Sequence, residues 1–167
     1  MRLNNRNKIG FFNFLSTLLV MISLFGIVGF LLERFQYNYL GFSSILFLLI
    51  PLVFITIFYL RGRQIFEYDS DGEALNFKNR NVLPYLSTPI SDEFPKYKLQ
   101  NYEILNGFIF KRLYINIASK KNHTITLRYD ISYLSKKELN DLKFSLKIIK
   151  REKTVDGRTR KSPRRIT

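Results

Sequence analysis

The sequence predicts an α+β membrane protein, in which a helical hairpin is followed by a small β-rich domain with an antiparallel curved sheet or barrel capped by a C-terminal helix. Three observations support this fold class. Two uncharged runs, about 9–32 and 40–60, are separated by only seven residues. From Gln64 onward apolar and polar residues alternate, which is typical of strands. After Ser135 the apolar residues recur at helical spacing.

Each uncharged run is long enough to cross the hydrocarbon core of a bilayer. The first has 24 residues, and the second has 21 and contains Pro51, which membrane helices tolerate. The short connection favours an antiparallel pair of helices, and it excludes both a channel pore loop and an external sensor domain. We therefore expect residues 1–63 to form a transmembrane hairpin.

Basic residues flank both open ends of this hairpin, whereas the turn holds Glu33 and Arg34, whose charges cancel. Because positive residues stay on the cytoplasmic side, we expect a multi-pass protein of the cytoplasmic (inner) membrane with both termini in the cytoplasm. A cleaved signal peptide is the competing interpretation, but the apolar run is too long and no small-x-small cleavage site follows it. The residues expected to determine topology are Arg2, Arg6, Lys8, Arg61 and Arg63.

Residues 64–150 are predicted to form the cytoplasmic β domain. The turn sequences Asp69-Ser70-Asp71-Gly72 and Asn106-Gly107 separate strands, because Asp, Asn and Gly tolerate turn conformations. Three prolines leave the number of strands between 81 and 97 open, with 82–86 as a candidate strand and the rest as loop. The other expected strands are 64–69, 73–79, 98–105, 108–118 and 124–130.

The last predicted element is a helix over 135–150. Ser135 and Glu138 form a capping box, in which each side chain binds the other residue's backbone N–H. An apolar stripe for packing on the sheet follows, made of Leu139, Leu142, Leu146 and Ile149. The apolar pattern then stops, and the basic residues 151–167 are expected to be a disordered tail.

Strands in consecutive hairpins before one capping helix, in stretches such as FEYDSDGEALNFKNRN and FKRLYINIASKKNHTITLRYDISYLSKKELNDL, resemble a bacterial pleckstrin-homology-like (PH-like) domain. With the upstream hairpin, the chain from Ile9 to about Lys150 resembles small bacterial two-helix membrane proteins that carry a cytoplasmic PH-like domain. The resemblance implies a binding or scaffold module at the membrane and transfers no catalytic signature.

The net charge of +14 divides unevenly along the chain. Residues 1–63 carry +5, residues 64–142 carry +1 and residues 143–167 carry +8. A basic segment near a membrane favours anionic lipid, with nucleic-acid phosphates, an acidic protein partner or solubility alone as alternatives. No aromatic residue lies within 151–167, so base stacking has no platform there. The candidate contact residues are Lys150, Arg151, Lys153, Arg158, Arg160, Lys161, Arg164 and Arg165.

The composition argues against catalysis. The chain has no Cys and a single His, which excludes thiolate and multi-His metal sites. His123 lies beside two lysines and is interpreted as an exposed turn residue. The turn Asp69-Ser70-Asp71-Gly72 lacks the spacing of an EF-hand loop, since its Gly comes at position 4. The sequence also contains no nucleotide-binding or hydrolase motif. The acidic residues of this hairpin tip are interpreted as solvated, with a bound cation or a basic partner as the alternative: Glu67, Asp69, Asp71 and Glu73.

We therefore expect a non-enzymatic integral membrane protein, without cofactor or metal, that presents an interaction domain to the cytoplasm. Its work would be scaffolding or assembly of a membrane complex, with membrane lipids and a protein as partners and auxiliary contact with anionic lipid. The alternative is an accessory subunit of a transporter or secretion machine that acts through its transmembrane helices. In that case Ser23, Gly26 and Gly29 would permit close approach of another helix.

Overall fold

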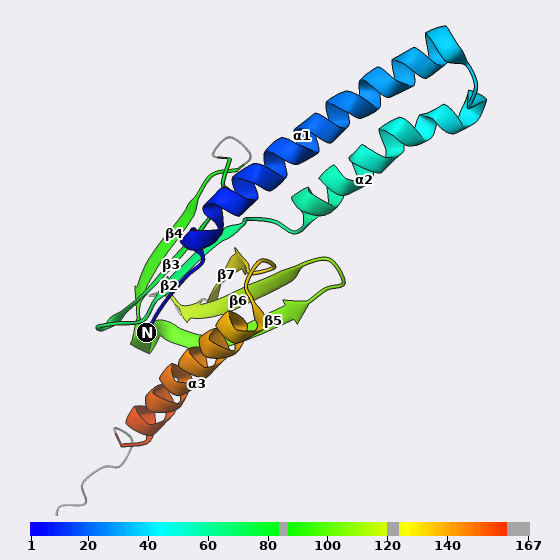
Figure 1. Cartoon of the computed structure of the whole chain (residues 1–167). Coiled ribbons are helices and arrows are strands. Elements are labelled where there is room, and N and C mark those ends of the chain that lie inside the picture. Colours follow the sequence, from blue (N-terminus) through cyan, green and yellow to red (C-terminus); the bar gives the residue numbers. More distant parts are fainter. Residues whose placement is uncertain (84–86, 120–123, 160–167) are drawn as a thin grey trace, which may run out of the picture.

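The computed structural model describes residues 1–83, 87–119 and 124–159, with side chains described up to Arg151. Two long helices, α1 (Ile9–Leu32) and α2 (Leu46–Leu60), lie side by side and project from one end of a β domain (Figure 1). A third helix, α3 (Lys136–Thr159), packs on the domain away from this helical pair. The predicted order of hairpin, antiparallel strands and C-terminal helix is confirmed.

The helical pair is apolar throughout. The two helical segments, Arg6–Tyr37 and Gly41–Leu60, each contain an 18-residue stretch with a mean hydropathy of 2.5, and both are long enough to span a membrane. Between them the chain reverses at Asn38, which adopts a left-handed conformation with φ 51°. Glu33 is buried at this turn, and its carboxylate accepts a hydrogen bond from the backbone N–H of Leu40.

Small residues bring α1 and α2 into contact. Gly26 lies against the backbone of Phe47 and the ring of Pro51, where a Cβ would collide with the Phe47 carbonyl oxygen. A Cβ at Gly29 would lie 3.5 Å from the ring of Phe47. Under the alternative of an accessory subunit these glycines would permit contact with a helix of another protein; in the structure they contact α2 of the same chain.

The first sheet contains an unexpected strand. It has the order β1-β2-β3-β4, all antiparallel, and it includes a strand that precedes α1. Leu3 of that strand is the direct partner of Tyr68, which follows α2. Residues 1–63 were assigned entirely to the hairpin, but the domain also includes the N-terminal strand, and the helical pair is inserted between its first two strands. These strands are β1 (Arg2–Asn4), β2 (Ile65–Asp69), β3 (Ala74–Arg80) and β4 (Ile90–Pro95).

The second sheet consists of β5 (Leu99–Asn106), β6 (Lys111–Ala118) and β7 (Thr124–Asp130) in chain order. The tight turn expected at Asn106-Gly107 is wrong, because the loop runs to Phe110 and the return strand begins at Lys111 rather than at 108. Gly107 has no left-handed φ, and the Phe110 ring packs over it, with its tip 2.9 Å from where a Cβ would lie.

A curved sheet or barrel is expected from the sequence, but the strands form two separate sheets that do not close into a barrel. The segment 81–97, mostly expected to be loop, contributes β4. Pro95 is tolerated because it ends a strand at the edge of the sheet, where a missing N–H costs no ladder bond. Of the candidate strand 82–86, residues 82 and 83 are not in a strand, and 84–86 lie outside the described residues.

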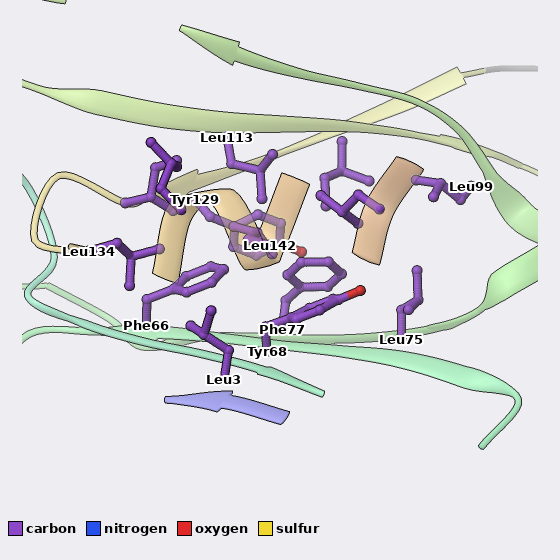
Figure 2. Packing of buried hydrophobic residues seen from close by; sticks show 14 of the residues in the cluster. Leu3, Phe66, Tyr68, Leu75, Phe77, Leu99, Leu113, Tyr129, Leu134 and Leu142 are labelled. Atoms are coloured by element: carbon purple, nitrogen blue, oxygen red, sulfur yellow. The ribbon is translucent and has the colours of Figure 1, made fainter. Parts of the chain in front are cut away.

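The core lies between the two sheets and α3. Figure 2 shows Phe66, Tyr68 and Phe77 extending from the first sheet toward Leu113 and Tyr129 of the second, with Leu142 of α3 among them. The predicted capping box is confirmed, since the Ser135 N–H donates to Glu138 Oε2 at 2.6 Å and the Glu138 N–H donates to Ser135 Oγ at 3.2 Å. The whole predicted stripe of α3 is buried, namely Leu139, Leu142, Leu146 and Ile149.

Helix α3 continues nine residues beyond its expected end at Lys150. Residues 151–159 are therefore helical, which corrects the predicted start of the disordered tail. The physical reason is that Arg151, Glu152 and Lys153 are good helix formers, and extending an existing helix avoids the cost of nucleation. Residues 160–167 lie outside the described residues.

Candidate functional site

The helical pair is attached to the domain through Tyr133, which follows β7. Its ring packs between Phe12 of α1 and Phe58 of α2, with centroid separations of 4.9 and 6.4 Å. The guanidinium of Arg61 lies 4.7 Å above the same ring, which is a cation–π contact. Burial raises the pKa of Tyr133, although the charge of Arg61 opposes it, so the phenol stays neutral. One domain side chain thus contacts both long helices.

Ion pairs join the N-terminal segment to the domain. The guanidinium of Arg6 donates to both carboxylate oxygens of Glu67, at 2.7 and 2.8 Å. The ammonium of Lys8 lies 3.0 Å from Glu138 Oε2, at the start of α3. Burial acts to raise the pKa of Glu138, but the bonds from the Ser135 backbone and from Lys8 outweigh it and lower the pKa below its usual value.

The acidic hairpin tip has a basic partner in its own chain. Arg2 Nε lies 3.0 Å from Asp69 Oδ2 and 3.2 Å from Asp71 Oδ2. Solvated residues are expected here, with a bound cation or a basic partner as the alternative. Asp69 and Asp71 are 35% and 52% exposed and also pair with Arg2, whereas Glu67 is 16% exposed and pairs with Arg6. The expected turn itself is confirmed, since the Asp71 N–H donates to Asp69 Oδ1 at 2.9 Å and Gly72 has φ 72°.

No group of three His, Cys, Asp or Glu side chains that could hold a metal ion occurs within 1–83, 87–119 and 124–151. His123 falls outside the described residues.

The five residues expected to determine topology all lie on the domain side of the helical pair. Four of them are ion-paired, since Arg63 Nη1 lies 3.4 Å from Asp130 Oδ2 in addition to the pairs of the N-terminal segment. The fifth, Arg61, stacks on Tyr133. These residues are apparent from the sequence as basic flanks, whereas their pairing with acidic residues is not.

Two buried asparagines hold the strands that meet at this junction, and the sequence analysis missed both. Asn5 donates to the Gln64 carbonyl at 2.7 Å and accepts from the Phe66 N–H at 2.8 Å, which fixes the chain before α1 to the chain after α2. Asn79 binds the backbone of both Ile65 and Asp130. For Asn79 the signal in the sequence was an Asn at an inward-facing strand position, where a buried amide needs partners. Asn5 follows the end of β1, so no such signal marks it in the sequence.

A pocket of about 220 Å³ opens where α2 ends. Asp130 lines this pocket and is 6% exposed. The Asp130 carboxylate accepts a hydrogen bond from the backbone N–H of Arg63 at 3.2 Å and lies 3.4 Å from Arg112 Nε. Gly62 permits this approach, because at φ 78° a Cβ there would collide with the Asp130 carboxylate. Arg128 of β7 also lines the pocket.

The basic residues proposed for lipid or partner contact are described only in part. Lys150 donates to Asn101 Oδ1 at 2.8 Å, so it also binds β5. Arg151 is exposed. Lys153 and Arg158 belong to α3, of which only the backbone is described at these positions. The remaining four lie outside the described residues, namely Arg160, Lys161, Arg164 and Arg165. Lipid contact through this segment stays a prediction.

Comparisons with models of known protein families, with curated proteins and with solved structures gave no match.

Proposed function

We propose that this chain is a non-enzymatic integral membrane protein whose helical pair anchors a PH-like interaction domain at the cytoplasmic face of the inner membrane. Its work is scaffolding or assembly of a membrane complex. The observation that carries the proposal is the insertion of the helical pair between β1 and β2, strands that are paired with each other. Both ends of the anchor are thereby fixed to one sheet, so the domain has a set orientation relative to the helices.

The surface of the helical pair supports the membrane assignment. Large apolar side chains project from both helices, and Phe14, Phe25 and Leu52 are 65%, 70% and 57% exposed. A continuous apolar surface of this kind is unfavourable in water and favourable in lipid. The five basic residues at the domain end agree with the domain being on the cytoplasmic side.

The layout of the domain supports the proposed PH-like character. Within each sheet the strands are antiparallel and follow the chain order, and one C-terminal helix covers the core between the sheets. Domains of this shape present loops and strand edges to partners while a small core keeps them folded. The described residues assign no partner directly, so we base the scaffold role on this shape and on the fixed orientation.

The alternative function, an accessory subunit acting through its transmembrane helices, has less support. The close-approach residues Gly26 and Gly29 are covered by Phe47 and Pro51 of the same chain. A partner helix would have to bind the larger apolar side chains on the outer faces instead.

The basic C-terminal segment is proposed to add contact with anionic lipid. Removing residues 151–167 from the full chain should weaken its binding to phosphatidylglycerol-rich vesicles. Added salt should weaken the binding of the intact chain to the same vesicles. Association that ignores both changes would contradict this auxiliary role.

Cysteine labelling in intact cells tests the topology, because the chain has no cysteine of its own. Gln36→Cys places a thiol at the exposed turn between the helices, and Lys147→Cys places one on the exposed face of α3. A membrane-impermeant maleimide should label the first variant from outside and should label the second only after lysis. Labelling of Lys147→Cys in intact cells would contradict the proposed orientation.

A further inference from the structure

The pocket at the end of α2 has an excess of positive charge that the domain does not compensate. Three guanidinium groups line it, from Arg63, Arg112 and Arg128, against the single carboxylate of Asp130, which leaves a net charge of +2. The three arginines come from two distant parts of the chain, the segment after α2 and the neighbouring strands β6 and β7. The register Arg112↔Asp130 and Tyr114↔Arg128 places the two strand arginines on one face of the sheet.

Several donors in this pocket are incompletely paired. The Nε atoms of Arg63 and Arg112 are buried and make no hydrogen bond among the described residues, although Arg112 Nε lies 3.4 Å from Asp130 Oδ1 as an ion pair. Arg128 is exposed and has neither a hydrogen bond nor an ion pair within the described part of the chain. Buried donors are almost always paired in folded proteins, so this arrangement favours an acceptor that the chain itself does not supply.

The lining indicates what kind of acceptor fits. Guanidinium groups match the oxygens of a phosphate group in charge and in fork geometry. The volume is below the roughly 300–1,000 Å³ of most small-molecule sites, which suits a small polar group rather than a whole ligand. Polar side chains of Asn81 and Ser87 complete the wall.

The position of the pocket indicates the source of the phosphate. Phe58, Tyr59 and Leu60, the last residues of α2, form its apolar side, and Tyr59 is 68% exposed. Tyr is favoured at the membrane interface, at the level of lipid headgroups. We propose that this pocket binds the phosphate group of an anionic phospholipid, with Arg63, Arg112 and Arg128 as donors and Asp130 orienting the first two. The inference rests on the proposed membrane insertion.

The site is tested with the full-length chain purified in a neutral maltoside detergent. Short-chain phosphatidylglycerol, short-chain phosphatidylcholine and inorganic phosphate are titrated separately, and bound molecules per chain are counted by native mass spectrometry. We expect one phosphatidylglycerol to bind, about tenfold more tightly than phosphatidylcholine, whose choline cancels the phosphate charge. Binding of inorganic phosphate alone, or equal binding of the two lipids, would overturn the lipid assignment.

Two variants locate the binding. Arg128→Gln removes an exposed, unpaired side chain, so it should fold normally and weaken phosphatidylglycerol binding about tenfold. Arg80→Gln makes the same change on β3, where Arg80 Nε lies 3.9 Å from Glu67, and it should leave lipid binding unaltered. Equal effects of the two substitutions would refute a specific site.

The same preparation separates this inference from the proposed function. A chain that needs detergent for extraction but ignores phosphatidylglycerol would refute the pocket and leave the anchor intact. A chain recovered in the soluble fraction without detergent would refute both.

Discussion

Arg6 donates two hydrogen bonds to Glu67, although the residues are 61 positions apart and both long helices lie between them in the chain. One residue precedes the helical pair and the other follows it. The contact therefore closes the loop that contains α1 and α2, next to the paired strands β1 and β2. Fixing the ends of a long loop has an entropic cost, which the strand pairing and this ion pair together offset.

Breaking this pair should loosen the N-terminal strand. Arg6→Gln is expected to lower the melting temperature of the detergent-solubilised chain by a few degrees, followed by circular dichroism, because Glu67 is only 16% exposed and loses a two-point partner. Arg80→Gln is the matched control, since Arg80 approaches the same carboxylate only to 3.9 Å. Equal melting temperatures for the two variants would contradict a special role for Arg6.

Tyr133 should be the main aromatic connection between the helices and the domain. Tyr133→Ala removes contacts with Phe12, Phe58 and Arg61, and we expect it to reduce the free energy of unfolding by about 2–3 kcal/mol. Tyr133→Phe keeps the ring and loses the bonds of the hydroxyl, a 3.5 Å bond to the Phe58 carbonyl and a bond to the Gln64 side chain, so it should cost about 1 kcal/mol. Similar losses in denaturant titrations of both variants would show that the ring packing is unimportant.

Glu138 should make the stability of the chain depend on pH in acid. Its pKa is lower in the folded chain than in the unfolded chain, so the stabilisation is fully present above the unfolded value of about 4.3. It is lost as the pH falls below that value and passes through the folded pKa. Melting temperatures measured between pH 6 and 3 should fall less steeply for Glu138→Gln than for the unmodified chain.

A matched substitution controls for the change of charge. Glu103→Gln makes the same chemical change on the exposed face of β5, away from Ser135 and Lys8. If Glu138→Gln and Glu103→Gln alter the acid profile alike, the capping and Lys8 contacts do not explain the pH dependence.

The sequence predicts the parts of this fold whose signals are local. Long uncharged runs predict α1 and α2, and the Ser135–Glu138 capping box with its apolar stripe predicts α3. Alternation of apolar and polar residues predicts five of the seven strands in the described part of the chain, close to their observed bounds. These patterns need no information about distant segments, because each depends on neighbours within a few residues.

The two missed strands depend on distant partners. β1 is three residues long and becomes a strand only because β2, more than sixty residues later, offers it an edge. β4 is flanked by Pro89 and ends at Pro95, residues that argue against a strand unless it lies at a sheet edge. Edge position is a property of the assembled sheet, so no local pattern reports it.

The candidate site was missed for the same reason. Arg112 and Arg128 are ordinary outward-facing strand residues in the sequence, and only the register of β6 with β7 brings them together beside Arg63. From the sequence alone, the basic residues before α1 predict only the orientation of the helices in the membrane. Their complement, the acidic tip from Glu67 to Asp71, is visible in the sequence, but their pairing follows only from the insertion of the helices between β1 and β2.

A disulfide between β1 and β2 tests that insertion most directly. Arg2 and Asp69 are direct partners, and the Ser70–Met1 and Asn5–Phe66 hydrogen bonds on either side make them a non-hydrogen-bonded pair, whose Cα atoms lie about 4.5 Å apart. That spacing suits a disulfide, and the chain has no other cysteine. In Arg2→Cys/Asn76→Cys, by contrast, the second thiol lies one strand further away, on β3.

Both double variants are oxidised mildly in native membranes and then cleaved between the helices at an engineered protease site. We predict that Arg2→Cys/Asp69→Cys stays joined on a non-reducing gel and separates on reduction, whereas Arg2→Cys/Asn76→Cys separates without reduction. Separation of the Arg2→Cys/Asp69→Cys fragments before reduction would contradict the pairing of β1 with β2, and with it the fixed attachment of the domain to its anchor.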